Sequence, residues 1–397
     1  MIDTSAVVKG ERGKDLVLTI DMVFQKQLDS IVMEELKATK NHSPYLNRYL
    51  EDAMAIAVKP KTGEILAMSG AHYDRKKQKY ENADYKVMYD THQPGSVVKG
   101  ATILTGLQSG VIQPGTTFYD EPVKIAGTPA KKSWKPYGLG TVNDIQALKV
   151  SSNVYMFYIA MRMGGEYHYQ PNKKISFQPE AVTDMRHSFS QFGLGVQTGV
   201  DFPYEAIGYR GEHPKAGNLL DFAIGNYDTF TTLQLAQYVS TIANDGYRVR
   251  PHFLKEVREP AAEGNEPGPM RRSIPADILN KIQMDDKYIK RVQEGFRQVA
   301  QAPDGTANKY FNTKPYTSYN IAAKTGTAES EIYENGKKAA DTENHSLVAY
   351  APMDDPEIAI AVLVPNSGVG MGYPDNGNIA KRTLKAYFDL QESSSKN

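Results

Sequence analysis

The sequence contains no cysteine, and this absence excludes several kinds of site at once. Disulfide scaffolds, zinc–thiolate sites, iron–sulfur clusters and cysteine nucleophiles are all ruled out. None of the eight histidines is paired at metal-ligand spacing, so the sequence predicts no metal site and no zinc hydrolase. Lys plus Arg and Asp plus Glu number 46 each, and the resulting net charge of zero argues against a nucleic-acid partner.

Long apolar runs are also missing. No stretch reaches the roughly 20 apolar residues of a membrane span, and the start, Met1 to Ser5, carries no apolar signal core. We interpret residues 1–14 as the N-terminal remnant of a trimmed chain and residues 391–397 as a polar tail. A membrane anchor, if the protein has one, is therefore expected outside this chain.

Hydrophobic periodicity places strands at both ends of the sequence and helices between them. The predicted strands are 16–21, 53–58, 65–68, 319–327, 347–350 and 358–364. The predicted helices follow residue 21 and cover 97–107, 148–163, 232–244 and 376–390. Residues 59–63 have the composition of a hairpin turn, and 259–269 that of an exposed loop. This order predicts an α+β fold whose sheet combines distant parts of the sequence.

Three short motifs occur in one order: Ser96-Val97-Val98-Lys99, Ser151-Ser152-Asn153 and Lys324-Thr325-Gly326-Thr327. Together they supply a serine nucleophile, candidate bases or proton relays, and a strand that can hold an acyl donor. This equipment suits acyl transfer through a serine ester without histidine.

Chance copies of these motifs are separated from them by context. Ser-x-x-Lys recurs at 393–396 in the polar tail, Lys-Thr-Gly at 61–63 in the predicted turn, and Ser-x-Asn at 318–320. Ser96 instead follows Pro-Gly at a predicted helix start, where free N–H groups can stabilise an oxyanion. Lys99 shares a helix face with Ser96, and burial would lower its pKa enough for it to act as base. Lys324 lies on a predicted strand, where Gly326 would let a ligand approach the backbone.

At these residues the chain resembles the penicillin-binding proteins, specifically the class B transpeptidase domain. The order of the motifs matches a known signature of β-lactamases and penicillin-binding proteins. Further landmarks follow the family order: Leu18-Thr19-Ile20-Asp21, Gly63 to Met68, Pro94-Gly95-Ser96, Leu233 to Ala236 and Ala243 to Gly246. The resemblance covers residues 15–390 and implies a central antiparallel sheet flanked by helices, with a mainly helical subdomain at roughly 72–250.

The resemblance also implies a role for each matched residue. Ser96 would be acylated, with Lys99 as its base. Ser151 would relay a proton, Asn153 would hold the peptide amide, and Lys324 would add positive potential. Thr325, Gly326 and Thr327 would form the substrate-binding strand: the two threonines would bind the donor's carboxylate, and the N–H groups of Ser96 and Thr327 would form the oxyanion hole. No cofactor is implied.

The reaction implied is that of a serine-type D-Ala-D-Ala transpeptidase. The substrates would be peptidoglycan stem peptides, and β-lactam antibiotics would acylate the same serine. Wall-synthesis polymerase and scaffold proteins are the implied partners. The implied location is the outer face of the cytoplasmic membrane, with an anchoring N-terminal helix outside this chain.

Several alternatives stay open. A D,D-carboxypeptidase or a serine β-lactamase would share the nucleophile, although no Glu-x-x-Leu-Asn segment supports the latter, and a non-catalytic penicillin-binding sensor or scaffold would share the fold. Trp134 lies between the first two motifs and either contacts the stem peptide at the cleft mouth or packs in the interior. His92 precedes Ser96 by four residues and offers a Ser–His alternative. The chain has Gly225-Asn226-Tyr227 where many relatives have Gly-Gln-Gly, which affects the fine shape of the site.

Overall fold

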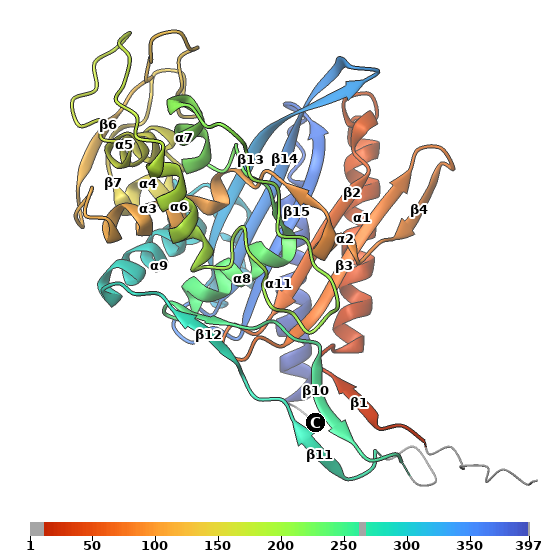
Figure 1. Ribbon diagram of the computed structural model, residues 1–397. Coiled ribbons are helices and arrows are strands. Elements are labelled where there is room, and N and C mark those ends of the chain that lie inside the picture. The colour runs from red at the N-terminus through yellow and green to blue at the C-terminus, as the bar shows by residue number, and fades with distance from the viewer. Residues whose placement is uncertain (1–11, 262–266, 396–397) are drawn as a thin grey trace, which may run out of the picture.

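The fold is built around a six-stranded antiparallel sheet with the order β13–β14–β15–β2–β3–β4 (Figure 1). The computed structural model describes residues 12–261 and 267–395. The sheet strands are β2 (Asp52–Val58), β3 (Ile65–Asp74), β4 (Lys79–Asn82), β13 (Ala322–Glu334), β14 (Lys337–Ala351) and β15 (Ile358–Gly368). Because β15 pairs with β2, strands from the two ends of the chain lie in one sheet, as the sequence predicted.

Two helices, α1 (Met22–His42) and α11 (Asp375–Ser394), cover one face of this sheet (Figure 1). The carboxylate of Asp21 caps α1 by accepting from the N–H groups of Val23 and Phe24. Phe24, Leu28 and Ile31 are buried at helical spacing, as predicted. The last helix continues four residues beyond its predicted end at residue 390, so most of the predicted polar tail is helical.

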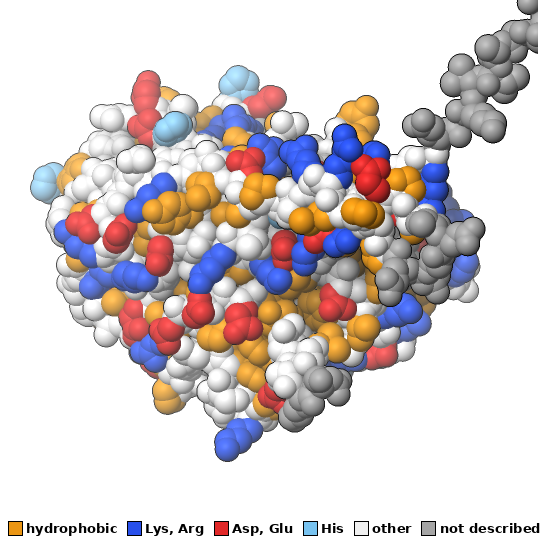
Figure 2. All heavy atoms as spheres, turned by 90° about the horizontal axis from the view of Figure 1, so that it is seen from below, with side chains coloured by type: hydrophobic (Ala, Val, Ile, Leu, Met, Phe, Trp, Pro, Cys, Tyr) orange, Lys and Arg blue, Asp and Glu red, His pale blue; other side chains and the backbone are white. Residues whose placement is uncertain are grey.

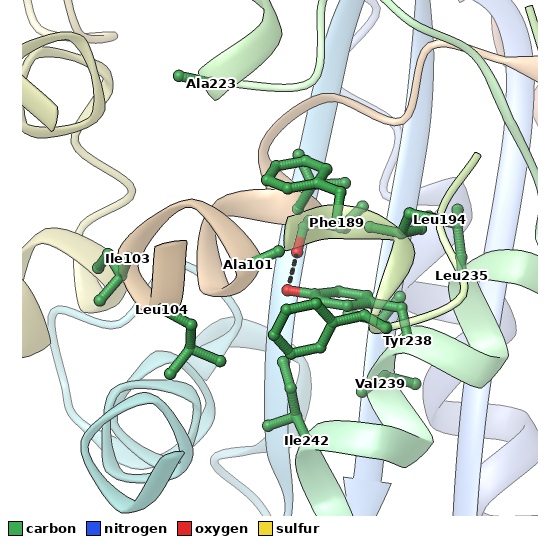
Figure 3. Packing of buried hydrophobic residues seen from close by; sticks show 14 of the residues in the cluster. Ala101, Ile103, Leu104, Phe189, Leu194, Ala223, Leu235, Tyr238, Val239 and Ile242 are labelled. Atoms are coloured by element: carbon green, nitrogen blue, oxygen red, sulfur yellow. Dashed lines mark hydrogen bonds between the residues drawn. The ribbon is translucent and has the colours of Figure 1, made fainter. Parts of the chain in front are cut away.

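The other face carries α8 and a mainly helical region. Its helices are α3 (Lys99–Gln108), α4 (Asp144–Lys149), α5 (Asn153–Met163), α6 (Glu180–Ser190), α7 (Ala216–Ala223), α8 (Thr232–Ala243) and α9 (Asp286–Gln301). The buried Tyr238 of α8 points its hydroxyl at the turn that leads into α3 and donates to the carbonyl of Val97 at 3.0 Å (Figure 3). This contact joins α8 to the 3-10 turn Gly95–Val98, which carries the first motif. The subdomain boundary at 72–250 stays a prediction.

The remaining elements are short and connect these layers. They are β1 (Asp15–Leu18), β5 (Thr91–His92), β6 (Thr117–Asp120), β7 (Gly140–Asn143), β8 (Phe230–Thr231), β9 (Tyr247–Val249), β10 (Leu254–Arg258), β11 (Met270–Ser273), β12 (Ile278–Lys281), α2 (Lys86–Tyr89), α10 (Asn308–Phe311) and the 3-10 turns Leu46–Tyr49, Gly95–Val98 and Tyr316–Ser318. The predicted loop at 259–269 connects β10 to β11, and its residues 262–266 lie outside the described residues, as do 1–11 and 396–397.

Three predicted elements differ from the structure. The predicted helix at 148–163 is two helices, α4 and α5, separated at residues 150–152. The predicted strand at 319–327 begins only at Ala322, after a 3-10 turn, and continues to Glu334. The predicted strand at 347–350 is the end of the much longer β14. These differences matter because two of them shape the predicted active site.

The surface agrees with the balanced composition. The face shown in Figure 2 carries basic and acidic side chains mixed together, without a region dominated by one sign. Within the described parts of the chain, we find no helix with the length and apolar character needed to cross a bilayer.

Candidate active site

The three motifs meet in one cleft of about 690 Å³, between the sheet and the helical region. Residues from all three line it: Ser96, Ser151, Asn153, Thr325, Gly326 and Thr327. The chance copies lie elsewhere. Gly63 sits in the β2–β3 turn with a φ of 80°, as predicted, Ser318 lies in a 3-10 turn, and Ser393 lies in the last turn of α11, with Lys396 beyond the described residues.

Ser96 lies in the 3-10 turn Gly95–Val98, which leads directly into α3. Gly95 has a φ of 61°, and its N–H donates to the carbonyl of Gly225 at 3.0 Å. A Cβ on Gly95 would lie 2.4 Å from the carbonyl oxygen of Thr327. Glycine at this position therefore lets the turn that contains Ser96 contact both the strand of the third motif and the loop after α7.

Lys99 is fully buried at the start of α3. Its Nζ lies 2.9 Å from the carbonyl oxygen of Ser151, 3.2 Å from Ser151 Oγ and 2.6 Å from Asn153 Oδ1. Burial lowers the pKa of Lys99 well below its usual value, the nearby charge of Lys324 lowers it further, and Asp120 opposes both. Because its pKa is lowered, the Lys99 side chain can be a neutral amine, and the lone pair of this amine can accept a proton. Within the described residues, its hydrogen bonds go to the second motif and none to Ser96.

Ser151 occupies the gap between α4 and α5, with a φ of 56°. A non-glycine residue in this left-handed region is uncommon and carries a conformational cost. The conformation places Ser151 Oγ between two amines, 3.2 Å from Lys99 Nζ and 2.9 Å from Lys324 Nζ. Ser152 then begins α5 by accepting from the N–H of Tyr155 at 3.0 Å. The predicted continuous helix was wrong because Ser151, in its left-handed conformation, interrupts it.

Lys324 is fully buried on β13 and reaches Ser151 from the opposite wall. It also donates to the carbonyl of Thr325 at 2.7 Å. Burial lowers its pKa to about 7. Two ammonium groups that share one hydroxyl repel each other, so the site favours a state with a single positive charge on the pair.

Asn153 connects the second motif to a loop that forms one wall of the cleft. Its Oδ1 accepts from Lys99, its Nδ2 donates to the carbonyl of Lys132 at 2.9 Å, and its N–H donates to Ser133 Oγ at 2.9 Å. Ser133 in turn donates to the buried Asp120 at 2.6 Å. Asp120 also accepts from Ser152, so a single carboxylate ties the loop to the second motif.

Asp120 and Ser133 are site residues that the motif analysis missed. Asp120 lies 32 residues before Ser152 in the sequence, and no recognisable motif links them. Thr306 was missed as well: its hydroxyl lies 2.9 Å from that of Thr325 and fixes the strand from the side of α10.

The third motif presents its threonines to the cleft, and Thr327 is exposed. Gly326 lines the cleft and also packs against the segment before Ser96. A Cβ there would lie 2.2 Å from Ser346 Oγ and 2.7 Å from the carbonyl oxygen of Pro94. The absence of a Cβ at Gly326 therefore lets the turn that contains Ser96 pack on β13, and the approach of a ligand to this backbone stays a prediction.

The structure distinguishes the two interpretations of Trp134. The ring is 62% exposed, lines the cleft and donates through Nε1 to the carbonyl of Val150 at 3.0 Å. Interior packing is therefore wrong, and contact with substrate stays a prediction. The Ser–His alternative gains no support, because no hydrogen bond joins His92 to Ser96 within the described residues, and burial lowers the pKa of His92.

Comparison with known proteins places this chain in a family. The penicillin binding protein transpeptidase domain family matches residues 53–387. Penicillin-binding protein 2A of Bacillus subtilis is 44% identical over 99% of the chain and 54% of its own length. Peptidoglycan D,D-transpeptidase MrdA of Escherichia coli is 25% identical over 95% of the chain and 58% of its own length. The chain thus spans about half the length of these relatives.

A solved structure agrees over nearly the whole fold. Penicillin-binding protein 2B from Streptococcus pneumoniae strain R6 superposes with a TM-score of 0.88 at 31% identity, covering 97% of this chain and 61% of that protein. The predicted α+β transpeptidase-like fold, with its antiparallel sheet and flanking helices, is confirmed.

Proposed function

Because this chain belongs to the penicillin-binding protein transpeptidase family, we propose that it is a peptidoglycan D,D-transpeptidase working through a Ser96 ester. The substrates are stem peptides ending in D-Ala-D-Ala. The observation that carries the proposal is the continuous chain of contacts from Lys99 through Ser151 to Lys324, beside Ser96 in one cleft. The relative MrdA, which is named a peptidoglycan D,D-transpeptidase, supports the same activity.

In the proposed acylation, neutral Lys99 accepts the Ser96 proton while Oγ attacks the carbonyl of the penultimate D-Ala. The peptide C–N bond breaks, and Ser151 passes a proton to the departing amine of the terminal D-Ala. An acceptor amine then attacks the ester, and its proton moves through the same lysine–serine relay. The ester C–O bond breaks, and Ser96 Oγ recovers a proton.

Binding in this scheme rests on the third motif. The hydroxyls of Thr325 and Thr327 bind the donor's terminal carboxylate, and the positive charge of Lys324 attracts it. The N–H groups of Ser96 and Thr327 stabilise the oxyanion, and losing one such donor typically raises the barrier by about 3 kcal/mol. Trp134 borders the stem peptide at the exposed wall of the cleft.

The proposal includes a cellular setting. β-Lactams would acylate Ser96 because they resemble the donor dipeptide, and polymerase and scaffold proteins of wall synthesis would be the partners. The domain would act on the outer face of the cytoplasmic membrane, held by an N-terminal helix outside this chain. Membership of the family and the penicillin-binding names of the relatives support the reaction with β-lactams and a role in wall synthesis.

The activity is tested with uncross-linked peptidoglycan strands, which supply both donor and acceptor stems. We expect the protein to release D-alanine and form cross-linked dimers, and we expect benzylpenicillin to stop both, as followed by mass spectrometry of the digested strands. Release of D-alanine without dimers would instead identify a carboxypeptidase. If neither product forms, while the relative from Bacillus subtilis cross-links the same strands, the proposal fails in favour of a non-catalytic role.

A further inference from the structure

A second groove, of about 910 Å³, opens from the catalytic cleft beyond Thr327. It lies between the β13–β14 hairpin and the segment Thr91–Gln93, which precedes the Ser96 turn, Gly95–Val98. We call it the acidic groove, because Glu329, Glu331, Asp341 and Glu343 form its hairpin wall. Asn226, Glu329 and Glu343 line both the acidic groove and the catalytic cleft, so the two spaces are continuous.

The acidic wall places like charges directly opposite one another. In the β13–β14 register, Glu329 faces Glu343, and Glu331 faces Asp341. Thr327, which precedes Glu329 by two residues, lies on the same face of β13, since side chains alternate along a strand. Like charges at directly opposed positions destabilise a sheet unless another group compensates them.

The negative charges of the outer pair, Glu331 and Asp341, are compensated by a lysine of the same hairpin. Lys338 Nζ lies 2.8 Å from the Glu331 carboxylate and 2.5 Å from that of Asp341. On the opposite wall, Lys131 is paired with Asp221 at 2.6 Å. These charges therefore have partners without any ligand.

The inner pair, Glu329 and Glu343, lies next to the catalytic cleft, and its negative charge is not fully compensated. Glu343 lies 3.3 Å from His345 Nε2, but His345 also faces Asp375 at 2.9 Å. Burial opposes protonation of this histidine, yet its hydrogen bonds with the two carboxylates raise its pKa to about 9, so one positive charge serves two acids. Among the described residues, Glu329 has no ion pair and no side-chain hydrogen bond, and it is exposed to the groove.

Two buried polar atoms of the groove residues also lack partners. His92 Nε2 and Asn226 Oδ1 make no hydrogen bond within the described part of the chain. Burial lowers the pKa of His92, so its ring is neutral and brings no positive charge toward the carboxylates. Asn226 lines both the groove and the cleft, but its Oδ1 is buried and is not open to a ligand in this structure.

We propose that Glu329 and Glu343 bind the primary ammonium group of an amine-bearing residue in a stem peptide. This inference rests on the proposed function, since that reaction uses peptides of this kind. Glu329 lies about 7 Å along β13 from Thr327, within reach of a side chain one or two residues from the scissile bond. The ammonium group belongs either to the donor stem in the cleft or to the incoming acceptor.

Two assays on Glu329→Gln separate these sources. In the donor arm, D-alanine release in a single turnover is compared for a stem pentapeptide with a free third-residue lysine and for the same peptide with that lysine acetylated. In the acceptor arm, an amine-free thioester acylates the enzyme, and Nα-acetyl-lysine amide competes with water for the acyl group. Glu334→Gln is the matched control: it removes the same charge from the same hairpin, and Glu334 lines neither the groove nor the cleft.

We expect Glu329→Gln to lower one of two ratios about fivefold: the D-alanine release rate of the free-lysine peptide relative to the acetylated peptide, or the share of acyl groups taken by the amine relative to water. This change corresponds to the loss of one partly exposed ion pair. Glu334→Gln should change neither arm. Thermal melting of Glu329→Gln establishes that the variant is folded. A loss confined to the donor arm or the acceptor arm supports the site and names its source. If both arms are unchanged while benzylpenicillin still acylates Ser96, this inference alone is wrong. If benzylpenicillin does not acylate the wild type, the proposed function falls and the inference falls with it.

Discussion

Lys99→Met is expected to slow acylation of Ser96 by benzylpenicillin by about 10³-fold, in the range lost when a general base is removed. Methionine keeps the length and apolar stem of lysine but cannot accept a proton. Folding should be little affected, because relief of the buried amine's desolvation cost offsets the hydrogen bonds lost to Ser151 and Asn153. The rate is measured by quenched-flow mass spectrometry of the acylated protein.

The pH profile identifies the cause of this loss. The pKa of Lys99 is lowered, so the amine loses its proton well below the usual lysine range, and the wild-type rate should rise with pH through that transition. Lys324, with a pKa of about 7, loses its positive charge as the pH rises above that value, which weakens attraction of the drug's carboxylate. In Lys99→Met the rising limb should be absent. Lys26→Met, on the exposed side of α1, is the control, and a wild-type rate and profile in Lys99→Met would contradict the assignment of the base.

Gly95→Ala is expected to lower acylation about 100-fold, the loss typical of a nucleophile displaced by about 1 Å. The new Cβ would lie 2.4 Å from the backbone oxygen of Thr327, and neither backbone can move without opening the site. The positive φ of 61° adds a cost of about 1–2 kcal/mol for any residue with a Cβ. We therefore expect a drop of about 2–4 kcal/mol in the free energy of unfolding, measured by urea denaturation.

Gly110→Ala provides the matched control. Gly110 also has a positive φ, 76°, but a Cβ there meets nothing within 4 Å. This variant should lose about 1–2 kcal/mol of stability from the backbone conformation alone and keep the wild-type acylation rate. Equal losses of acylation in the two variants would contradict the view that Gly95 allows the turn Gly95–Val98 to contact β13.

The three motifs were predictable because each is local and each sits beside a helix start or a strand. Their meeting in one cleft came from the family resemblance, because spacing in sequence does not fix distance in the fold. The break at Ser151 was not predictable from periodicity. Apolar residues on both sides of it keep helical spacing, and its left-handed conformation depends on contacts with Lys99 and Lys324, which come from other parts of the chain.

Other differences had signals that could have been used. Asn335-Gly336, with φ values of 51° and 74°, is the preferred sequence of a two-residue hairpin turn and would have predicted the long β13–β14 hairpin. Helix α9 was not among the predicted helices, although its signals are present in the sequence. It begins after Asp285, which caps it, and it buries Ile289, Val292 and Phe296 at helical spacing. Asp120 had no such signal, since its role depends on hydroxyl groups distant in sequence.

The central claim is that Ser96 is the acylated nucleophile, and intact-protein mass spectrometry after incubation with benzylpenicillin tests it most directly. The account predicts a lasting adduct of one drug molecule on the wild type and on Ser318→Ala, whose serine belongs to a chance copy of the second motif, and no adduct on Ser96→Ala. An adduct that persists in Ser96→Ala would contradict the account, as would a wild type that neither binds nor consumes the drug. Rapid loss of the drug without a lasting adduct would identify a β-lactamase instead.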